Sequence, residues 1–378
     1  MIKLLSVIGA RPQFIKAAAL HRSIKNNFKD TINEVLVHTG QHYDHNMSKV
    51  FFDELELPEP QFNLGVNNQS VAAQLPEMII GIDKILNAEH PDAVLVYGDT
   101  TSTLAGALAA QKNNIPLIHI EAGMRSNNKS QPEEINRILT DHLSSLLFCS
   151  SSSAVEHLSN ENINHNKRDK NSIEQPGVFM VGDVMVDNIF FYSDKAQHVS
   201  KILEQLNEQK KNYFLATVHR ASTADDAGHL QSIFKAFDTI TKEDQRSLYL
   251  PLHPRTRNNL TNEIQQLIDK NKLIKIIEPQ SYIDMMSLQQ NALIVFTDSG
   301  GMQKESYLLK TPCVVLRNET EWTELILNGN NILAGTNTDQ IINAYKLLRL
   351  KNDFTFPVLY GDGNAAERIC NIIVQQFS

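Results

Sequence analysis

Short apolar runs alternate with longer amphipathic runs along most of this chain, and this alternation limits the possible folds more than any other feature. The strand-like runs of the first half are residues 4–8, 34–38, 93–97, 117–120, 146–149 and 178–181. Helix-like segments follow several of them, among them the alanine-rich 100–112 and the segment from Pro132 on. Strands that alternate with helices predict a parallel sheet covered on both faces.

The second half of the chain repeats this pattern. Its strand-like runs are residues 214–218, 248–252, 274–277, 293–296, 313–316 and 332–334. A polar segment at 160–175 without periodicity is typical of a surface loop, and 188–209 reads as a helix and linker between the halves. The length of 378 residues suits two domains. We therefore expect an α/β protein with two Rossmann-like, doubly wound domains, 1–187 and 188–364, that face a common cleft.

Composition excludes several classes of protein. The chain carries a net charge of -8, which disfavours a general nucleic-acid binder. Its three cysteines, Cys149, Cys313 and Cys370, are scattered among apolar residues, which indicates buried thiols rather than disulfides or a zinc site. Neither a signal peptide nor a membrane span is recognisable. We expect a soluble, cytoplasmic protein.

Polar residues follow four of the predicted strands directly. Asp99 follows the run 93–97, and Glu121 follows 117–120 with Arg125 shortly after it. His219 and Arg220 follow 214–218. In the fourth case TDSGG follows the run 293–296. The carboxyl ends of parallel strands are where such folds place their ligands, so these positions are candidates for a site. For Asp99 alone, capping of the next helix remains an alternative.

The segment FTDSGGMQKE carries the most specific signal for phosphate binding. Ser299, Gly300 and Gly301 begin a helix whose first N–H groups lack partners, and glycine lets an anion approach them. Glu305, on the second turn, is placed to reach a ribose. A plain tight turn is the alternative, and Glu305 favours nucleotide binding over it.

The opening segment GARPQFIK is a strand-to-helix turn with one glycine and two cations. The dinucleotide fingerprint G-x-G-x-x-G is absent there. Arg11 and Lys16 indicate instead an anion contact at the start of the first helix.

Three further motifs leave their interpretation open. In PEEINR, Glu133 and Glu134 point about 100° apart on a helix, so only one is expected to face a site, and both also suit the helix dipole. In HPRTR, His253 contributes either to a basic anion contact or to a solvated loop. In HTGQHYD, residues 38–44, a polar loop is favoured over a metal site.

These motifs together resemble the non-hydrolysing UDP-N-acetylglucosamine 2-epimerase family. The resemblance rests on GARPQFIK, GDTTSTLAGALAA, HIEAGMRS, PEEINR, TVHR and TDSGGMQKE in this order, and it extends to YGDG at 360–363. It implies a glycosyltransferase-B type fold in which the C-terminal helix, here 365–378, packs back on the first domain. It also implies an isomerase that acts on a UDP-sugar without metal or other cofactor, is homodimeric, and binds neither nucleic acid nor membrane.

The resemblance also implies roles for individual residues. Asp99, Glu121, Glu133 and His219 match the family's catalytic positions. Arg11, Lys16, Arg220, Ser299, Gly300 and Glu305 match its UDP-binding positions. We add Arg125, His253 and Gly301 as candidate substrate contacts because of their places after strands. Which carboxylate takes the proton at C2 of the sugar stays open.

Several departures from the family pattern bear on the substrate. Gln13 and Phe14 stand where many members have Glu and Ala, and Tyr43 replaces an arginine of a loop linked to allosteric activation. GARPQFIK, VGDVM, HPRTR and TEW resemble a subgroup acting on UDP-2,3-diacetamido-2,3-dideoxy-glucuronate, whose extra carboxylate suits Arg255 or Arg257. A UDP-sugar-dependent glycosyltransferase of the same fold is the main alternative. A hydrolysing epimerase and a non-catalytic nucleotide sensor agree less well with these motifs.

Overall fold

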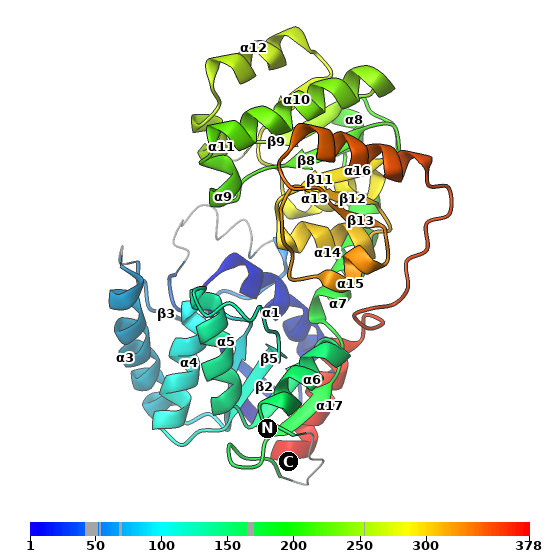
Figure 1. The fold of residues 1–378 in the computed structure, drawn as a ribbon. Helices are drawn as coiled ribbons and strands as arrows, with labels where there is room; N and C mark the ends of the chain where they lie inside the picture. The colour runs from blue at the N-terminus through cyan, green and yellow to red at the C-terminus, as the bar shows by residue number, and fades with distance from the viewer. Residues whose placement is uncertain (42–51, 53, 68–69, 165–169, 253) are drawn as a thin grey trace. The chain divides into compact units, whose positions relative to one another are not determined.

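The computed structural model describes residues 1–41, 52, 54–67, 70–164, 170–252 and 254–378. Within these ranges the chain forms two compact units (Figure 1). Unit 1 comprises residues 1–190 and 358–378, and unit 2 comprises residues 191–357. Whether they correspond to the separate domains expected at 1–187 and 188–364 stays a prediction.

Unit 1 contains a parallel sheet of seven described strands in the order β3-β2-β1-β4-β5-β6-β7. The order reverses between β1 and β4, which makes this position the topological switch point of a doubly wound sheet. The strands are β1 (Ile2–Ile8), β2 (Ile32–His38), β3 (Phe62–Asn63), β4 (Ala93–Tyr97), β5 (Leu117–Ala122), β6 (Leu146–Cys149) and β7 (Gly177–Met180).

Helices cover this sheet because each apolar strand needs burial on both faces. They are α1 (Arg11–Ser23), the π-helix η1 (Ile24–Phe28), α3 (Val71–Glu89), α4 (Thr101–Lys112), α5 (Pro132–Leu143), α6 (Ser152–Asn160) and α17 (Ala365–Phe377). Helix α7 (Val184–Val199) begins in unit 1 and ends in unit 2. The C-terminal helix α17, red in Figure 1, packs against α1. Asp187 of α7 accepts hydrogen bonds from the N–H groups of Ala365 and Ala366 at the start of α17, at 3.2 and 2.9 Å.

Unit 2 contains a parallel sheet of six described strands in the order β10-β9-β8-β11-β12-β13, with its switch point between β8 and β11. The strands are β8 (Phe214–Thr217), β9 (Leu248–Pro251), β10 (Ile274–Ile277), β11 (Ile294–Thr297), β12 (Cys313–Val315) and β13 (Asn331–Leu333). The helices are α8 (Ile202–Gln205), α9 (Ala221–Ala224), α10 (Ala227–Asp244), α11 (Pro254–Asn258), α12 (Asn262–Lys270), α13 (Tyr282–Asn291), α14 (Gly300–Leu308), α15 (Thr323–Leu327) and α16 (Thr338–Leu350).

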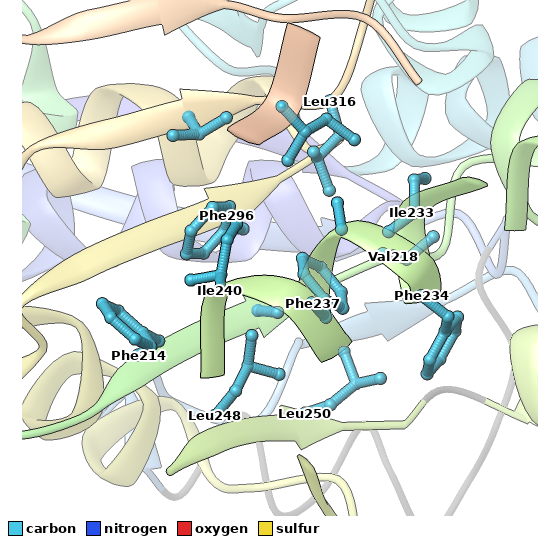
Figure 2. Close-up of a cluster of buried hydrophobic side chains, with 14 of the residues drawn as sticks. Phe214, Val218, Ile233, Phe234, Phe237, Ile240, Leu248, Leu250, Phe296 and Leu316 are labelled. Carbon is cyan, nitrogen blue, oxygen red and sulfur yellow. The ribbon is translucent and has the colours of Figure 1, made fainter. Parts of the chain in front are cut away.

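The core of unit 2 follows from the alternation of side chains along its strands. On one face, Phe214 of β8 and Phe296 of β11 pack with Phe237 of α10 in the cluster of Figure 2. Leu215 and Val295, their neighbours in sequence, belong to a second cluster on the opposite face. These two clusters explain why the strands read as continuous apolar runs.

Every strand predicted from the sequence is present, with bounds within two residues, and the α/β, doubly wound fold class is confirmed. Cys149, Cys313 and Cys370 are buried and unpaired with one another, as expected. None of the described helices is long and apolar enough to cross a membrane.

Candidate active site

The turn between β1 and α1 is held by one buried side chain, that of Gln13. Its Oε1 accepts hydrogen bonds from the N–H groups of Gly9 and Ala10 at 2.8 and 3.0 Å. Its Nε2 donates to the carbonyl of Tyr97 and to the hydroxyl of Thr103 at 2.9 and 3.0 Å. Gln13 therefore joins the turn that carries Arg11, which is half-buried, to the end of β4 at the switch point.

Lys16 of α1 forms a buried ion pair with Glu121 at the end of β5. Only 11% of the Lys16 side chain and 16% of the Glu121 side chain are exposed. Burial lowers the pKa of Lys16, but the negative charges of Glu121 and Asp99 outweigh it and raise that pKa above its ordinary value. Lys16 is therefore a permanent cation beside two carboxylates.

Glu121 has a backbone conformation that is rare for a residue with a side chain. Its φ is +72°, and the pairing of β5 with β6 shifts register between Ile120 and Ala122. Gly98, at the end of β4, also has a positive φ of 61°. A Cβ at Gly98 would lie 3.1 Å from Glu121 Oε2 and 3.2 Å from Lys16 Nζ, so a side chain there would be strained by its φ and would press on this ion pair.

Asp99 pairs with Arg137 of α5 and does not cap α4. Arg137 Nη2 lies 2.6 Å from Asp99 Oδ2, and its Nε lies 3.2 Å from the same oxygen. The cap of α4 is Thr100, whose hydroxyl accepts the N–H of Thr103. Asp99 is thus held by a charged partner beside the switch point, and the capping alternative is wrong.

Glu133 and Glu134 have different environments, as helix geometry requires. Glu133 is exposed, whereas Glu134 is 1% exposed and accepts the N–H groups of Ser126 and Asn127, both at 2.9 Å, and a hydrogen bond from Arg137. Burial raises the pKa of Glu134, but these donors outweigh it and lower that pKa. Glu134 therefore fixes the loop before α5, and Arg137 links it to Asp99.

Arg125 also interacts with carboxylates of its own unit. It donates to Glu161 at 2.6 and 2.8 Å and to Asp141 at 2.7 Å, and 3% of its side chain is exposed. Burial lowers the pKa of Arg125, but these carboxylates outweigh it and raise the pKa. Most N–H donors of Arg125 are therefore already bound to acceptors of the protein and are not available to a substrate.

In unit 2 a single buried carboxylate organises the end of β8. Asp298, which is 0% exposed, accepts the N–H groups of His219 and Arg220 at 3.0 and 2.9 Å. The side chain of His219 is 43% exposed, and Arg220 is exposed as well. Asp298 thus fixes the backbone at the switch point of unit 2 and leaves both side chains accessible to solvent.

The first turn of α14 has the features expected of an anion site. Ser299 is its N-cap, with Gly300 and Gly301 as the first helical residues. A Cβ at Gly300 would collide with Oε1 of Glu321, a carboxylate paired at 2.9 Å with Arg317. Glycine at 300 thus leaves room for a carboxylate, which already lies beside the start of the helix.

Glu305 lies on the next turn of α14 and is 8% exposed. Burial raises the pKa of its carboxyl group, and a 2.9 Å hydrogen bond from Gln289 opposes this effect only in part. A buried carboxylate with one amide partner retains acceptor capacity for a ligand hydroxyl.

Known proteins are similar to this chain over nearly its whole length. A family model described as UDP-N-acetylglucosamine 2-epimerase matches residues 25–374. A UDP-N-acetylglucosamine 2-epimerase homolog of Methanococcus maripaludis is 44% identical over 98% of this chain and 99% of its own length. The UDP-2,3-diacetamido-2,3-dideoxy-D-glucuronate 2-epimerase of Pseudomonas aeruginosa is 39% identical over 99% of this chain and 100% of its own.

The chain belongs to the UDP-N-acetylglucosamine 2-epimerase family. A crystal structure of the Methanocaldococcus jannaschii UDP-GlcNAc 2-epimerase with UDP-GlcNAc and UDP superposes with a TM-score of 0.84 at 37% identity, over 98% of this chain and 99% of that one. The predicted resemblance and the glycosyltransferase-B type fold are confirmed. The relatives are isomerases acting on carbohydrates, which does not favour the glycosyltransferase alternative.

Residues that sequence reasoning associated with this epimerase family lie at both switch points. In unit 1, Asp99 and Glu121 lie near Lys16. In unit 2, Asp298 accepts the N–H of His219 and directly precedes Ser299, so His219 and Ser299 lie near each other. His253 lies outside the described residues, and so do residues 42–46, which include Tyr43 and most of the histidine-containing loop after β2. The described residues contain no group of three or more His, Cys, Asp or Glu that would hold a metal.

Sequence reasoning missed several residues that position the epimerase family's motifs. They are Arg137, Asp298, Gln289, Arg317 and Glu321, together with the structural role of Gln13. Only Arg137 had a usable signal, because its spacing of three residues from Glu134 places the two on one helix face. The other partners lie far away in the sequence or in irregular segments.

Proposed function

We propose that this protein interconverts the C2 epimers of a UDP-2-acetamido sugar. The substrate is UDP-GlcNAc, with UDP-ManNAc as product, or the 2,3-diacetamido-glucuronate analogue. Family membership and the names of two similar relatives support this reaction. The observation that carries it is the strained backbone of Glu121, whose carboxylate is paired with the buried Lys16. Asp99 is also close enough to Lys16 that both carboxylates raise the pKa of this lysine.

The reaction needs two proton transfers and one leaving group. In the first half a carboxylate removes the C2 proton while the C1–oxygen bond breaks, which releases UDP and leaves a C1–C2 double bond. In the second half UDP adds back to C1 and a proton is delivered to the opposite face of C2. Asp99, Glu121, Glu133 and His219 are the proposed acid–base groups, and carboxylates on separate strands and helices suit transfer at two faces.

Binding of UDP is the proposed role of Arg11, Lys16, Arg220, Glu305 and the turn 299–301. The charge on the departing diphosphate grows as the C1–oxygen bond breaks, so cations and unpaired N–H groups stabilise the transition state. At the start of α14, phosphate would replace the carboxylate of Glu321 beside Gly300. For Arg125, whose donors are engaged by Asp141 and Glu161, we propose an indirect contribution through the loop it fixes.

The choice between the two sugars depends on whether Arg255 or Arg257 binds the carboxylate of a uronate. Arg255 and Arg257 are exposed and pair with Asp225 and Glu278 at 3.0 and 2.7 Å. If the uronate is the substrate, exchanging one of these surface partners for its carboxylate is inexpensive. Arg255→Ala and Arg257→Ala should then raise the KM for the uronate and leave the KM for UDP-GlcNAc unchanged. An unchanged KM for the uronate in both variants would exclude this contact.

One experiment tests the reaction class directly. The purified protein is incubated with each UDP-sugar in D2O, and proton NMR follows C2 and the products. Epimerisation predicts deuterium at C2 with the sugar still attached to UDP. Release of free sugar would indicate hydrolysis, and transfer to an added acceptor would indicate a glycosyltransferase. Absence of exchange with both substrates in folded protein would overturn the proposal.

The cellular setting is a further part of the proposal. An epimerised UDP-2-acetamido sugar is an activated precursor, so we infer a role in the cytoplasmic synthesis of surface-polysaccharide precursors. We also infer a homodimer, as the family resemblance implies. Light scattering at micromolar concentration tests the dimer, and a monomeric mass with full exchange activity would exclude it as a requirement.

A further inference from the structure

His119 is a fully buried histidine on β5 whose two ring nitrogens both have partners. Its Nδ1 lies 2.7 Å from Oδ1 of Asp141, and its Nε2 lies 2.8 Å from the carbonyl oxygen of Gly98. Neither the ring nor the carboxylate has measurable exposure, at 0% for both side chains. Both hydrogen bonds are therefore direct and shielded from solvent.

Both partners of the ring are hydrogen-bond acceptors. A backbone carbonyl can only accept. The second oxygen of Asp141 already accepts from the N–H of Gly123 at 3.1 Å and from Arg125 at 2.7 Å, which is the environment of an ionised carboxylate. A neutral imidazole carries one N–H and would place a lone pair against one of these acceptors. Both contacts are favourable only when the ring carries two protons.

The surrounding charges balance such a buried imidazolium. Asp141 of α5 is its anionic partner, Arg125 is the second cation on Asp141, and Glu161 after α6 accepts from Arg125 at 2.6 Å. On the outer side, His142 of α5 lies 3.0 Å from Glu161. The charges alternate in the order His119, Asp141, Arg125 and Glu161. Each buried charge therefore has a partner of opposite sign.

This chain of contacts joins the two turns that carry the proposed catalytic carboxylates. Gly98, whose carbonyl binds the ring, immediately precedes Asp99. Gly123, whose N–H binds Asp141, lies two residues after Glu121. Gly98, Glu121 and Gly123 all have positive φ, between 61° and 79°. The two glycines adopt this conformation without strain, whereas Glu121 keeps it only where surrounding contacts impose it.

We propose that His119 is a positioning residue that stays doubly protonated and fixes the turns of Asp99 and Glu121. This inference rests on the proposed function, because its kinetic consequence requires the epimerase reaction. His119 contacts no substrate and acts through the Gly98 carbonyl and through Asp141. Its loss displaces the carboxylates from C2 and lowers kcat, while the groups that bind UDP keep KM nearly constant.

The protonation state is tested in the wild-type protein without any substrate. Nitrogen-15 NMR of histidine-labelled protein, recorded from pH 6 to 8.5, distinguishes a ring with two N–H groups from a neutral ring. His119, assigned in the wild-type protein by nuclear Overhauser contacts from its ring to the backbone of Gly98, should show two protonated nitrogens throughout the range. A single protonated nitrogen at pH 8 would overturn the proposal, even if every variant failed to fold.

The positioning role is tested by kinetics with matched variants. His119→Gln and Asp141→Asn should each lower kcat by roughly 10²-fold, the cost of small misplacement, with KM changed less than about twofold. His142→Gln, at the exposed end of the same chain of charges, should retain wild-type kcat. An unchanged kcat in folded His119→Gln would refute positioning. If the wild-type protein itself exchanged no C2 proton, the proposed function would fail, while the NMR spectrum would still decide the state of His119.

Discussion

The two units place polar residues at equivalent positions of their sheets but hold them by different means. At the switch point of unit 1, Glu121 and Asp99 are paired with the cations Lys16 and Arg137. At the switch point of unit 2, Asp298 binds the backbone of His219 and Arg220, and α14 begins with Ser-Gly-Gly. In unit 1 the acidic side chains themselves are paired with cations, whereas in unit 2 a carboxylate holds the backbone that carries His219 and Arg220.

This difference matches the two tasks in the proposed reaction. Proton transfer needs carboxylates with a fixed orientation, and paired charges on neighbouring elements supply it. Binding of a diphosphate needs donors that cost no reorganisation, and backbone N–H groups at a helix start supply these. Substitutions of the carboxylates in unit 1 should therefore affect turnover most, and substitutions of Asp298 or of α14 in unit 2 should affect UDP affinity most.

The largest effect is expected from Glu121→Gln in unit 1. Loss of an acid–base group should lower C2 deuterium exchange by roughly 10²–10⁴-fold. The same change leaves Lys16 buried without its anion, which should lower the free energy of unfolding by about 3–5 kcal/mol. Exchange is measured by NMR in D2O and stability by urea unfolding.

Two further variants separate the catalytic effect of Glu121 from the structural one. Lys16→Met combined with Glu121→Gln should recover much of the stability but none of the exchange. Glu89→Gln, which removes a partly exposed partner of Lys3, should change stability by less than about 1 kcal/mol. Wild-type exchange in Glu121→Gln would contradict the role of this carboxylate.

The sequence predicted the strand ends well because burial dictates their composition. Strands covered on both faces must be apolar, so the polar residues Asp99, Glu121 and His219 stand out directly after them. The start of α14 was recognisable for a similar reason, since Ser299 and the two glycines have specific roles at a helix N-terminus.

Contacts over long sequence separations could not be predicted in this way. Gln13 binds the Tyr97 carbonyl 84 residues away, and Asp298 binds the backbone of His219 79 residues away. The positive φ of Glu121 depends on such contacts and has no local signal. Helix geometry did indicate that Glu133 and Glu134 diverge, but only the fold decides that Glu134 is the buried one.

Asp298→Asn should break the arrangement in unit 2 and produce the next largest effect. An amide retains one acceptor oxygen but places N–H groups against the N–H groups of His219 or Arg220. Loss of hydrogen bonds to a buried charge should cost about 1.5–3 kcal/mol, and UDP affinity should fall by roughly tenfold or more. Calorimetric titration with UDP measures this affinity.

Asp226→Asn is the matched control for Asp298→Asn. Asp226 is an exposed aspartate that also accepts a backbone N–H, that of His229 at 2.8 Å, at the start of α10. UDP affinity should be unchanged in this variant. Equal losses of affinity in the two variants would mean that the switch point of unit 2 has no special role.

Glu305→Gln tests the role of unit 2 in binding because it should lower UDP affinity without lowering the free energy of unfolding. An amide cannot bind a ribose hydroxyl as strongly as a carboxylate does, so UDP affinity should fall by roughly tenfold, equivalent to about 1.4 kcal/mol. Removal of a buried charge should leave the free energy of unfolding unchanged or raise it. The exposed Glu319→Gln serves as a control and should change neither quantity.

The pH dependence of stability provides a second measurement on Glu305. Burial raises the pKa of this carboxyl group in the folded protein above 4.5. Its stabilising contribution is therefore present below pH 4.5 and is lost as the pH rises through the folded value. The difference in unfolding free energy between Glu305→Gln and wild type should grow in favour of the variant over this window. A difference independent of pH would show that the pKa of Glu305 is the same in the folded and the unfolded protein, which would contradict a shift caused by burial.

The smallest effect is expected from substitution of Asp187 in unit 1. Like Asp298 in unit 2, Asp187 accepts hydrogen bonds from two backbone N–H groups. Asp187 accepts two N–H groups at the start of α17, where Asn364 makes no side-chain cap. Asp187→Ala should lower the free energy of unfolding by about 0.5–2 kcal/mol, the usual value of a helix cap, without changing C2 exchange.

Burial raises the pKa of Asp187 to about 6, although the N–H groups of Ala366 and Ala365 oppose the shift. Its stabilising contribution is full below pH 3.8 and is lost as the pH rises through about 6. Asp187→Asn, which retains an acceptor without the charge, should remove this pH dependence in urea unfolding and keep full exchange activity. If Asp187→Asn instead abolished exchange, turnover would also depend on the contact between α7 and α17, and the assignment of turnover to the carboxylates at the switch point of unit 1 would be wrong.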